Sequence, residues 1–464
     1  MVNPALDAAL MVGAPVLATS VVGSVSAMKF VCADRNRRAA MRKAWQVRRT
    51  WSKTAVRVGL FQTDKSAKVG QAVPLSGELR TAESKPGLII PSLVVRPDDF
   101  GLVISVKVVG RIGLEEWTAA ADYLAHAWEV RTVSVEHGKP GWLRVRALLR
   151  DPLTEPMDFV PVPADAVDLT SWLLGRDSYG ESTFVRSSGV SGVVEAGLAG
   201  FGKTSLLNAR ISQLAVSAAV QFVFIDGKGG PDYDDLFCRA WLSCKDDPEQ
   251  VLSILKNVHS LMTDRQGAIK TVLGVKNMWH LGPSAAWPLV LVVIDEAHTF
   301  FREIKGNTAE AKERNAVNAE IARLVEELVR KGRNVGLQIV LATQKSTGDA
   351  IPTFIRENCQ VAISFAQRTS EASIATLGSD ISDYPHAHPR RLLDPAYIGV
   401  ATMQAEGRPG FTLVRTPYAS DELAAQIAAD TAHLVADPAA LLADQLTATA
   451  TIPAARPAMD DIPA

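Results

Sequence analysis

A glycine-rich segment that contains one lysine and one hydroxyl residue could bind the phosphates of a nucleotide. Residues 197–204 read Gly-Leu-Ala-Gly-Phe-Gly-Lys-Thr and match the spacing GxxxxGK[ST] in full. The segment lies between a predicted strand, Gly192–Ala196, and a predicted helix, Thr204–Leu214, which is the context that this motif requires. Backbone N–H groups of such a loop surround phosphates, and the helix N-terminus adds a favourable field. The residues expected to bind the nucleotide are Gly197, Leu198, Ala199, Gly200, Phe201, Gly202, Lys203, Thr204 and Ser205.

Four polar side chains are expected to carry the reaction. The Lys203 ammonium would contact the β- and γ-phosphates, and the Thr204 hydroxyl would bind Mg²⁺. Asp295 and Glu296 directly follow the apolar run Leu289–Ile294, so they stand at the sheet edge where α/β proteins bind ligands. We expect Asp295 to hold Mg²⁺, and Glu296 to orient and polarise the attacking water as a general base. ATP and Mg²⁺ are therefore the predicted cofactors.

Two further residues are assigned to hydrolysis. Gln344 follows the predicted strand Leu337–Ala342, where its amide could sense the γ-phosphate; an ordinary amide at a strand end is the alternative. Arg333 lies with Arg330 and Lys331 at the end of a long predicted helix. Either one of these three cations reaches the site of a neighbouring subunit as an arginine finger, or they interact with the helix dipole.

Strands and helices alternate between about residues 168 and 417, which is the pattern of a mainly parallel sheet covered by helices. Continuous apolar runs, typical of parallel strands buried on both faces, occupy residues 220–225, 289–294, 337–342 and 361–365. A strand between the glycine-rich loop and the acidic pair, together with Glu296, favours the RecA-like branch of P-loop ATPases over a GTPase or a small-molecule kinase. The predicted fold class is α/β, with a RecA-like P-loop ATPase domain.

A smaller α+β domain is expected before the ATPase domain. Strands are predicted at residues 102–109, 130–135 and 142–149, and a helix at 114–128. The predicted organisation is an apolar helix with a basic flank at 1–50, a connector at 51–98, the α+β domain at 99–167, the ATPase domain at 168–418, and a helix with a mobile tail at 419–464.

The first fifty residues predict a contact with a membrane. From Ala8 to Met28 the chain has 21 residues without a charge, about the length of a helix that crosses a bilayer. Eight basic residues follow up to Arg49, with Asp34 as the only acid among them. This pattern predicts a membrane-associated helix with the rest of the chain in the cytoplasm; a helix that packs on the body of the protein is the alternative. The basic run suits anionic lipid and DNA phosphate equally.

Composition argues against other kinds of site. The four cysteines, Cys32, Cys238, Cys244 and Cys359, form no CxxC pair, which argues against a zinc site or a disulfide framework and fits reduced thiols in a cytosolic body. The net charge is -1, from 49 basic and 50 acidic residues. Any surface that binds nucleic acid must therefore be a local patch.

The order of these motifs resembles the FtsK/SpoIIIE family of DNA translocases. The resemblance spans roughly Leu173–Phe365. Its motifs are the loop 197–204, Asp226-Gly-Lys-Gly-Gly230, Arg265, Val293-Ile-Asp-Glu296 and the run 330–344. Segments 399–403, 407–409 and 415–418 resemble the actinobacterial plasmid-transfer (TraB-like) branch, in which a membrane-associated segment precedes the motor. The resemblance implies an ATP-driven translocase of double-stranded DNA that forms a homo-oligomer, a hexameric ring, and serves conjugal plasmid or integrative-element transfer. By itself, Asp226–Gly230 is equally typical of a surface turn.

Three departures from the family are visible. Lys345 follows Gln344 where the family usually has Arg-Pro. The segment 366–369, Ala-Gln-Arg-Thr, does not keep the family's usual Arg directly after the strand. The winged-helix module that reads DNA sequence is not recognisable after Tyr418, where the chain is acidic and rich in alanine. Any choice of DNA sequence is therefore expected from a separate partner.

Other functions remain as alternatives. They are a chromosome-segregating motor of the FtsK type and a related secretion ATPase that moves polypeptide. Asp295-Glu-Ala-His298 also suggests a DEAH-type helicase, but Ala-Thr-Gln344 stands where such helicases have Ser-Ala-Thr, so His298 is interpreted as an ordinary residue. A protein that binds ATP only as a switch is disfavoured by Glu296.

Overall fold

The chain divides into two compact units. The computed structural model describes residues 30–64, 87–344, 350–404 and 410–450. Unit 1 runs to Pro152, and unit 2 begins at Leu153. The sequence had placed the start of the ATPase domain at residue 168. In the structure the preceding segment already belongs to unit 2, because Leu153 packs with Ala366 and Val400 in a small apolar cluster.

Unit 1 is built on a four-stranded antiparallel sheet with the order β3-β4-β6-β5. Its strands are β3 (Leu93–Pro97), β4 (Gly101–Lys107), β5 (Thr132–His137) and β6 (Trp142–Leu148). The predicted helix 114–128 is interrupted at Ala120 and forms α3 (Leu114–Ala119) and α4 (Ala121–Trp128). A separate pair of short strands joins β1 (Gln62–Asp64) and β2 (Gly87–Ile89). This is the small α+β domain expected from the alternating strands.

Helix α2 (Arg35–Arg57) completes unit 1, although the sequence had divided this segment between a basic flank and a connector. The Asp34 carboxylate caps its first turn by accepting from the Arg37 backbone N–H at 2.6 Å. A buried stripe of small and apolar side chains packs against the sheet; it consists of Ala40, Ala44, Val47, Trp51, Thr54 and Ala55. Trp51 stacks on Trp117 at a centroid distance of 5.3 Å. The stripe has helical spacing, so the basic run is the outer face of a packed helix.

No helix among the described residues is long and apolar enough to cross a membrane. The uncharged segment Ala8–Met28 lies outside the described residues, so its predicted membrane association stays a prediction.

Unit 2 contains a mixed ten-stranded sheet, where the sequence had predicted a mainly parallel one. Its order is β11-β10-β12-β13-β9-β14-β15-β16-β7-β8. The first six strands in this order are parallel to one another, and the remaining neighbours pair antiparallel. The parallel strands are β9 (Gly192–Ala196), β10 (Val220–Asp226), β11 (Ala240–Lys245), β12 (Leu289–Asp295), β13 (Leu337–Thr343) and β14 (Val361–Ser364). The antiparallel strands are β7 (Ser171–Asp177), β8 (Ser182–Arg186), β15 (Val400–Gln404) and β16 (Phe411–Arg415).

Alternate side chains of the parallel strands point into two apolar cores, one on each face of the sheet. Helices α5 (Lys203–Ala215) and α11 (Asp421–Thr431) contribute to the core that holds Phe222, Leu291 and Val340. Helices α6 (Pro248–Leu273) and α8 (Ala309–Lys331) contribute to the core that holds Val223, Val292 and Ile339. Burial on both faces explains why these strands are continuous apolar runs in the sequence.

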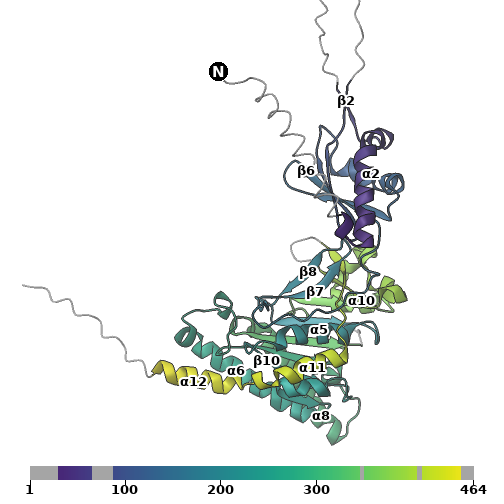
Figure 1. Ribbon diagram of the computed structural model, residues 1–464. Helices are drawn as coiled ribbons and strands as arrows, with labels where there is room; N and C mark the ends of the chain where they lie inside the picture. Colours follow the sequence, from purple (N-terminus) through teal and green to yellow (C-terminus); the bar gives the residue numbers. More distant parts are fainter. Residues whose placement is uncertain (1–29, 65–86, 345–349, 405–409, 451–464) are drawn as a thin grey trace, which may run out of the picture. The chain divides into compact units, whose positions relative to one another are not determined.

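The end of the described chain is helical where the sequence had predicted a mobile tail. Helix α12 (Pro438–Ala450) lies beside α6 (Figure 1). Its Leu442 is 4% exposed within the core that α6 and α8 share. Burial of this leucine stabilises a helix that the alanine- and threonine-rich composition of the segment did not predict.

Candidate nucleotide-binding and hydrolysis site

The glycine-rich loop joins the centre of the sheet to a helix. Strand β9 ends at Ala196 between β13 and β14, and α5 begins at Lys203, the seventh residue of the motif. Gly202, which precedes α5, has φ +108°, and a Cβ on it would lie 2.9 Å from the Gly399 Cα. Both the backbone angle and the close approach require glycine here. The loop conformation therefore depends on the glycine spacing that identified it.

A cavity of about 470 Å³ opens over this loop. Its lining includes nine of the predicted site residues: Leu198, Ala199, Gly200, Gly202, Lys203, Thr204, Ser205, Asp295 and Gln344. Gly197 and Phe201 belong to the loop but do not line the cavity. Several residues from distant segments complete the wall, and these were not among the predicted site residues: Pro156, Met157, Lys228, Asp232, Ile398, Gly399, Arg415, Thr416, Pro417 and Tyr418.

Lys203 faces the acidic pair at the end of β12. Its Nζ lies 3.3 Å from the Asp295 Oδ1 and 3.4 Å from the Glu296 Oε1, and its side chain is 4% exposed. Two carboxylates thus compensate the burial of this lysine side chain. The Lys203 side chain thus contacts both carboxylates at once. The phosphates of a bound nucleotide would compete with Asp295 and Glu296 for this lysine.

Glu296 is held at both carboxylate oxygens. Its Oε2 lies 3.1 Å from the His298 Nδ1 and accepts the Gln344 backbone N–H at 3.1 Å, while its Oε1 faces Lys203. Burial acts to raise the pKa of Glu296, but the His298 hydrogen bond, the Lys203 charge and the Gln344 N–H outweigh it and lower that pKa to about 2. The side chain is therefore a carboxylate at neutral pH, as a general base must be.

The backbone of Glu296 adopts φ +46°, in the left-handed region that non-glycine residues rarely occupy. The turn directly after β12 thereby directs the carboxylate toward Lys203 and His298. Strain of this kind is maintained only where neighbouring contacts fix it.

The turn after β10 lies in the same site. Asp226 pairs in register with Asp295, and its Oδ1 accepts the Lys228 N–H at 2.9 Å. Burial raises the pKa of Asp226. Lys228 lines the nucleotide cavity and pairs with Asp232 at 2.7 Å. The sequence allowed two interpretations of the Asp226–Gly230 segment, a motif of the family or a surface turn. In the structure this segment lies beside the cavity over the glycine-rich loop.

The residues assigned to Mg²⁺ suit that ion. Among the described residues, no three His, Cys, Asp or Glu side chains gather as a metal site. Magnesium, however, is commonly held by one or two protein oxygens together with nucleotide phosphates. Asp295 and Thr204 both line the cavity, and the buried Asp295 Oδ1 accepts no hydrogen bond, although the Lys203 Nζ lies 3.3 Å from it. A carboxylate oxygen left in this state fits a cation ligand.

Arg333 is far from the cavity of its own chain. It lies in the turn Arg333–Val335 that precedes β13, whereas Gln344 directly follows that strand. The seven residues of β13 separate the two ends by roughly 20 Å. Arg333 is exposed, and it does not line the nucleotide cavity. A role as arginine finger therefore requires the site of another subunit.

A buried ion pair lies behind the loop. Glu195 on β9 and Arg210 on α5 are both fully enclosed, with the Arg210 Nη1 3.9 Å from the Glu195 Oε1. Arg210 also donates to Gln338 and covers the Trp172 ring at 4.5 Å. Burial outweighs the nearby Arg210 charge and raises the pKa of Glu195 to about 7. This pair links the strand before the loop to the helix after it.

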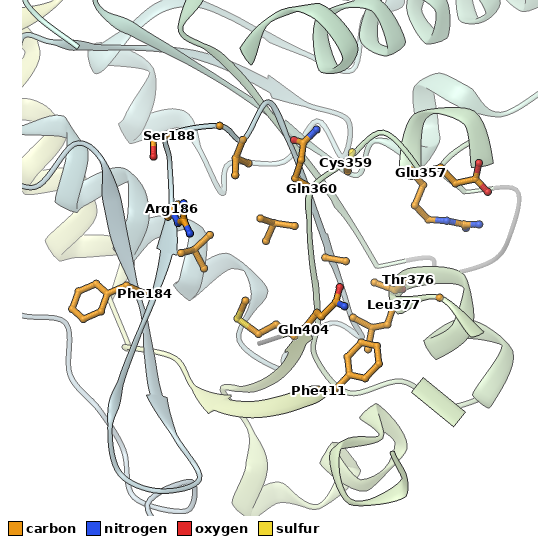
Figure 2. Close-up of a pocket in the computed structure, with 18 residues that line it drawn as sticks. Phe184, Arg186, Ser188, Glu357, Cys359, Gln360, Thr376, Leu377, Gln404 and Phe411 are labelled. Carbon is orange, nitrogen blue, oxygen red and sulfur yellow. The ribbon is translucent and has the colours of Figure 1, made fainter. Parts of the chain in front are cut away.

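A larger cavity, of about 580 Å³, lies at the other ends of β15 and β16. Its walls carry Phe184 and Arg186 from β8, Gln360 before β14, and Phe411 from β16 (Figure 2). None of the predicted site residues lines it. Most of the predicted site residues therefore line the smaller cavity, beside the glycine-rich loop, whereas Glu296 and Arg333 do not.

Comparison with known proteins finds similarity to conjugal transfer proteins and to DNA translocases. Residues 38–149, from within α2 to just after β6, match the N-terminal domain of actinomycete conjugal transfer proteins (TraSA). The DNA translocase FtsK of Vibrio vulnificus is 24% identical over 330 residues, which cover 61% of this chain and 31% of the relative. The chain is a distant relative of the FtsK DNA translocases.

A second relative is DNA translocase FtsK 1 of Neisseria meningitidis, 24% identical over 394 residues that cover 70% of this chain and 46% of the relative. The chain thus matches less than half the length of these curated relatives. Among solved structures, the pCW3 conjugation coupling protein TcpA, a monomer form with ATPγS, has 17% identity and a TM-score of 0.49, covering 73% of this chain and 92% of TcpA.

Sequence reasoning missed His298 and the distant cavity walls for different reasons. His298 lies only two residues after Glu296, so a contact between the two side chains could have been expected from the sequence. It was missed because His298 was interpreted as an ordinary residue. Pro156, Met157 and Tyr418 come together only because residues 153–159 pair with the end of the sheet, where the Phe159 N–H donates to the Tyr418 carbonyl at 2.9 Å. A contact between segments so far apart in the chain cannot be predicted from a local sequence pattern.

Proposed function

We propose that the chain is an ATP-driven translocase of double-stranded DNA that serves conjugal transfer of a plasmid or an integrative element. The observation that carries the proposal is the Glu296 carboxylate, held beside Lys203 at the glycine-rich loop. The relation to FtsK translocases supports duplex DNA as the track, and the TraSA-type N-terminal domain supports conjugal transfer.

In the proposed reaction, the loop N–H groups and Lys203 bind the phosphates of ATP. Mg²⁺, held by Thr204, Asp295 and the phosphates, would offset phosphate charge. Once Lys203 turns to the phosphates, the Glu296 Oε1 becomes free to accept a proton from water, while Oε2 keeps its bonds to His298 and Gln344. The Gln344 N–H connects Glu296 to the end of β13. A movement of Glu296 during hydrolysis would therefore be transmitted to the backbone of β13.

We propose that the chain forms a homo-oligomer, a hexameric ring. Arg333 lies at the strand ends opposite its own nucleotide cavity, so a head-to-tail arrangement would bring it to the cavity of a neighbour. It would there stabilise the charge that develops during hydrolysis.

We further propose that the outer face of α2 contacts an anionic membrane from the cytoplasmic side. The helix contains nine basic residues and no acid, and seven of the nine are exposed: Arg35, Arg37, Arg42, Arg48, Arg49, Lys53 and Arg57. Trp45 on this face is 60% exposed, with the Arg49 guanidinium 5.1 Å from its ring centroid. Basic residues with an exposed tryptophan suit the headgroup region.

Hydrolysis by the full chain, measured with duplex DNA, single-stranded DNA and unfolded polypeptide side by side, tests the proposed function. We expect duplex DNA to stimulate hydrolysis most. Glu296→Gln should bind ATP with unchanged affinity and hydrolyse it at least about 100-fold more slowly, because the amide cannot accept the proton. Stimulation by polypeptide alone or single strands alone, or full activity of Glu296→Gln, would contradict the proposal.

A further inference from the structure

We propose that His298 is a positioning residue for hydrolysis: its imidazole fixes one oxygen of Glu296 so that the other faces the γ-phosphate. The inference rests on the proposed function, in which Glu296 is the general base. It assigns a role to a residue that lies outside the motifs of phosphate and metal binding.

The two oxygens of Glu296 have separate surroundings. Oε2 faces the end of β13, where the Gln344 N–H donates to it at 3.1 Å and the His298 Nδ1 lies at 3.1 Å. Oε1 faces the glycine-rich loop, where Lys203 is its neighbour at 3.4 Å. A carboxylate anchored at one oxygen can turn only by breaking those two bonds. Its remaining oxygen is thereby fixed in direction.

His298 is itself held in place. It opens the short helix α7 (His298–Phe301), whose Phe300 is buried in the core. The His298 Nδ1 also lies 3.3 Å from the Thr343 Oγ1, on the last residue of β13. A proton on Nδ1 therefore lies near two acceptor oxygens, those of Glu296 and Thr343. Contacts from α7 and from β13 meet at the same carboxylate.

The space around Glu296 suits the approach of water. An open cavity of about 460 Å³ is lined by Gly227, Lys228, Glu296, His298, Thr299 and Gln344. Lys228 and Gln344 also line the nucleotide cavity, so the two spaces adjoin at these residues. His298 and Glu296 thus stand where water can reach the γ-phosphate side of the site.

Removal of the imidazole would take away one of the two contacts that hold Oε2 and would let the carboxylate rotate. Rotation would reduce the turnover rate, whereas the Lys203 and loop contacts that bind ATP would remain.

The test compares His298→Ala and His298→Asn with the wild type in the full chain. Asn can place an amide N–H near the position of Nδ1, but Ala cannot. We expect His298→Ala to lower kcat about 10- to 100-fold with little change in KM or in the affinity for an ATP analogue. His298→Asn should recover most of the lost kcat.

His259→Ala is the matched control. His259 pairs with Glu327 at 2.7 Å and is as exposed as His298, at 26%, but it lies between α6 and α8 outside the site. We expect this variant to keep the wild-type kcat and KM. A wild-type kcat in His298→Ala would overturn the inference, as would an equal loss of kcat in the Asn and Ala variants. An active Glu296→Gln variant would instead overturn the proposed function.

Discussion

Glu296 and Lys203 show how single residues set the chemistry of this site. Lys203 lies between Asp295 and Glu296, and the contacts of Glu296 keep its pKa low despite burial. From the sequence, the types and order of these residues were predictable because each follows a strand that is recognisable by itself. The anchoring of Glu296 by His298 was not, because it depends on the φ angle of Glu296 and on the end of β13.

At the same scale, Glu195 predicts a pH-dependent stability. Its pKa in the folded chain, about 7, lies above the ordinary 4.5, so the folded chain binds this proton more tightly than the unfolded chain. The stabilisation is complete below pH 4.5 and is lost as the pH rises through 7. We expect the free energy of unfolding to fall between pH 5 and 8 by on the order of 3 kcal/mol more in the wild type than in Glu195→Gln.

Urea unfolding at both pH values measures this difference. Glu195→Gln also leaves the buried Arg210 without its carboxylate, so the variant should be less stable overall. The slope with pH, and not the absolute stability, is therefore the relevant quantity. Equal slopes in the two proteins would show that Glu195 does not titrate in this range.

At the scale of elements, the sequence predicted best the strands that are buried on both faces. Strand β9 has the predicted bounds, and β10, β12 and β13 each extend one residue past the predicted end. Helix α2 was misjudged because its buried stripe of alanines is masked by nine basic residues. The antiparallel strands β8 and β16 were not predicted, since they are short and only partly buried. Helix α12 depends on the tertiary contact of Leu442.

The basic face of α2 carries a prediction at this scale. Arg42→Glu/Arg49→Glu in the full chain should weaken binding to vesicles that contain phosphatidylglycerol by at least about 10-fold, since each basic residue near such a surface contributes about 1 kcal/mol. Binding to phosphatidylcholine vesicles should not change. Co-sedimentation at low and high salt measures both, because the electrostatic part weakens with ionic strength.

Lys107→Glu/Arg111→Glu is the matched control, because both residues are exposed in unit 1 but lie outside α2. We expect it to bind vesicles as the wild type does. If both double variants lose the same amount of vesicle binding, the net charge of the chain and not the face of α2 is responsible. If the α2 variant no longer binds duplex DNA but still binds anionic vesicles, this face binds DNA phosphate instead.

At the scale of the whole molecule, the chain has two units with separate cores, and different features belong to each unit. Unit 1 contains the TraSA-type domain, and unit 2 contains the cavity over the glycine-rich loop and every residue assigned to hydrolysis. A small α+β part followed by a larger part of alternating strands and helices was predictable from the sequence pattern. The position of its boundary was not, because residues 153–159 are attached to unit 2 by contacts with β16 and the segment after it.

Displacement of a third strand from a DNA triplex tests the central claim most directly, because a motor that moves along duplex DNA must remove a strand bound in its path. We expect the full chain to release the third strand only with ATP and Mg²⁺, and the Lys203→Ala and Glu296→Gln variants to release none. If the third strand remains bound while duplex DNA stimulates ATP hydrolysis by the wild type, the chain is a DNA-dependent ATPase and not a translocase.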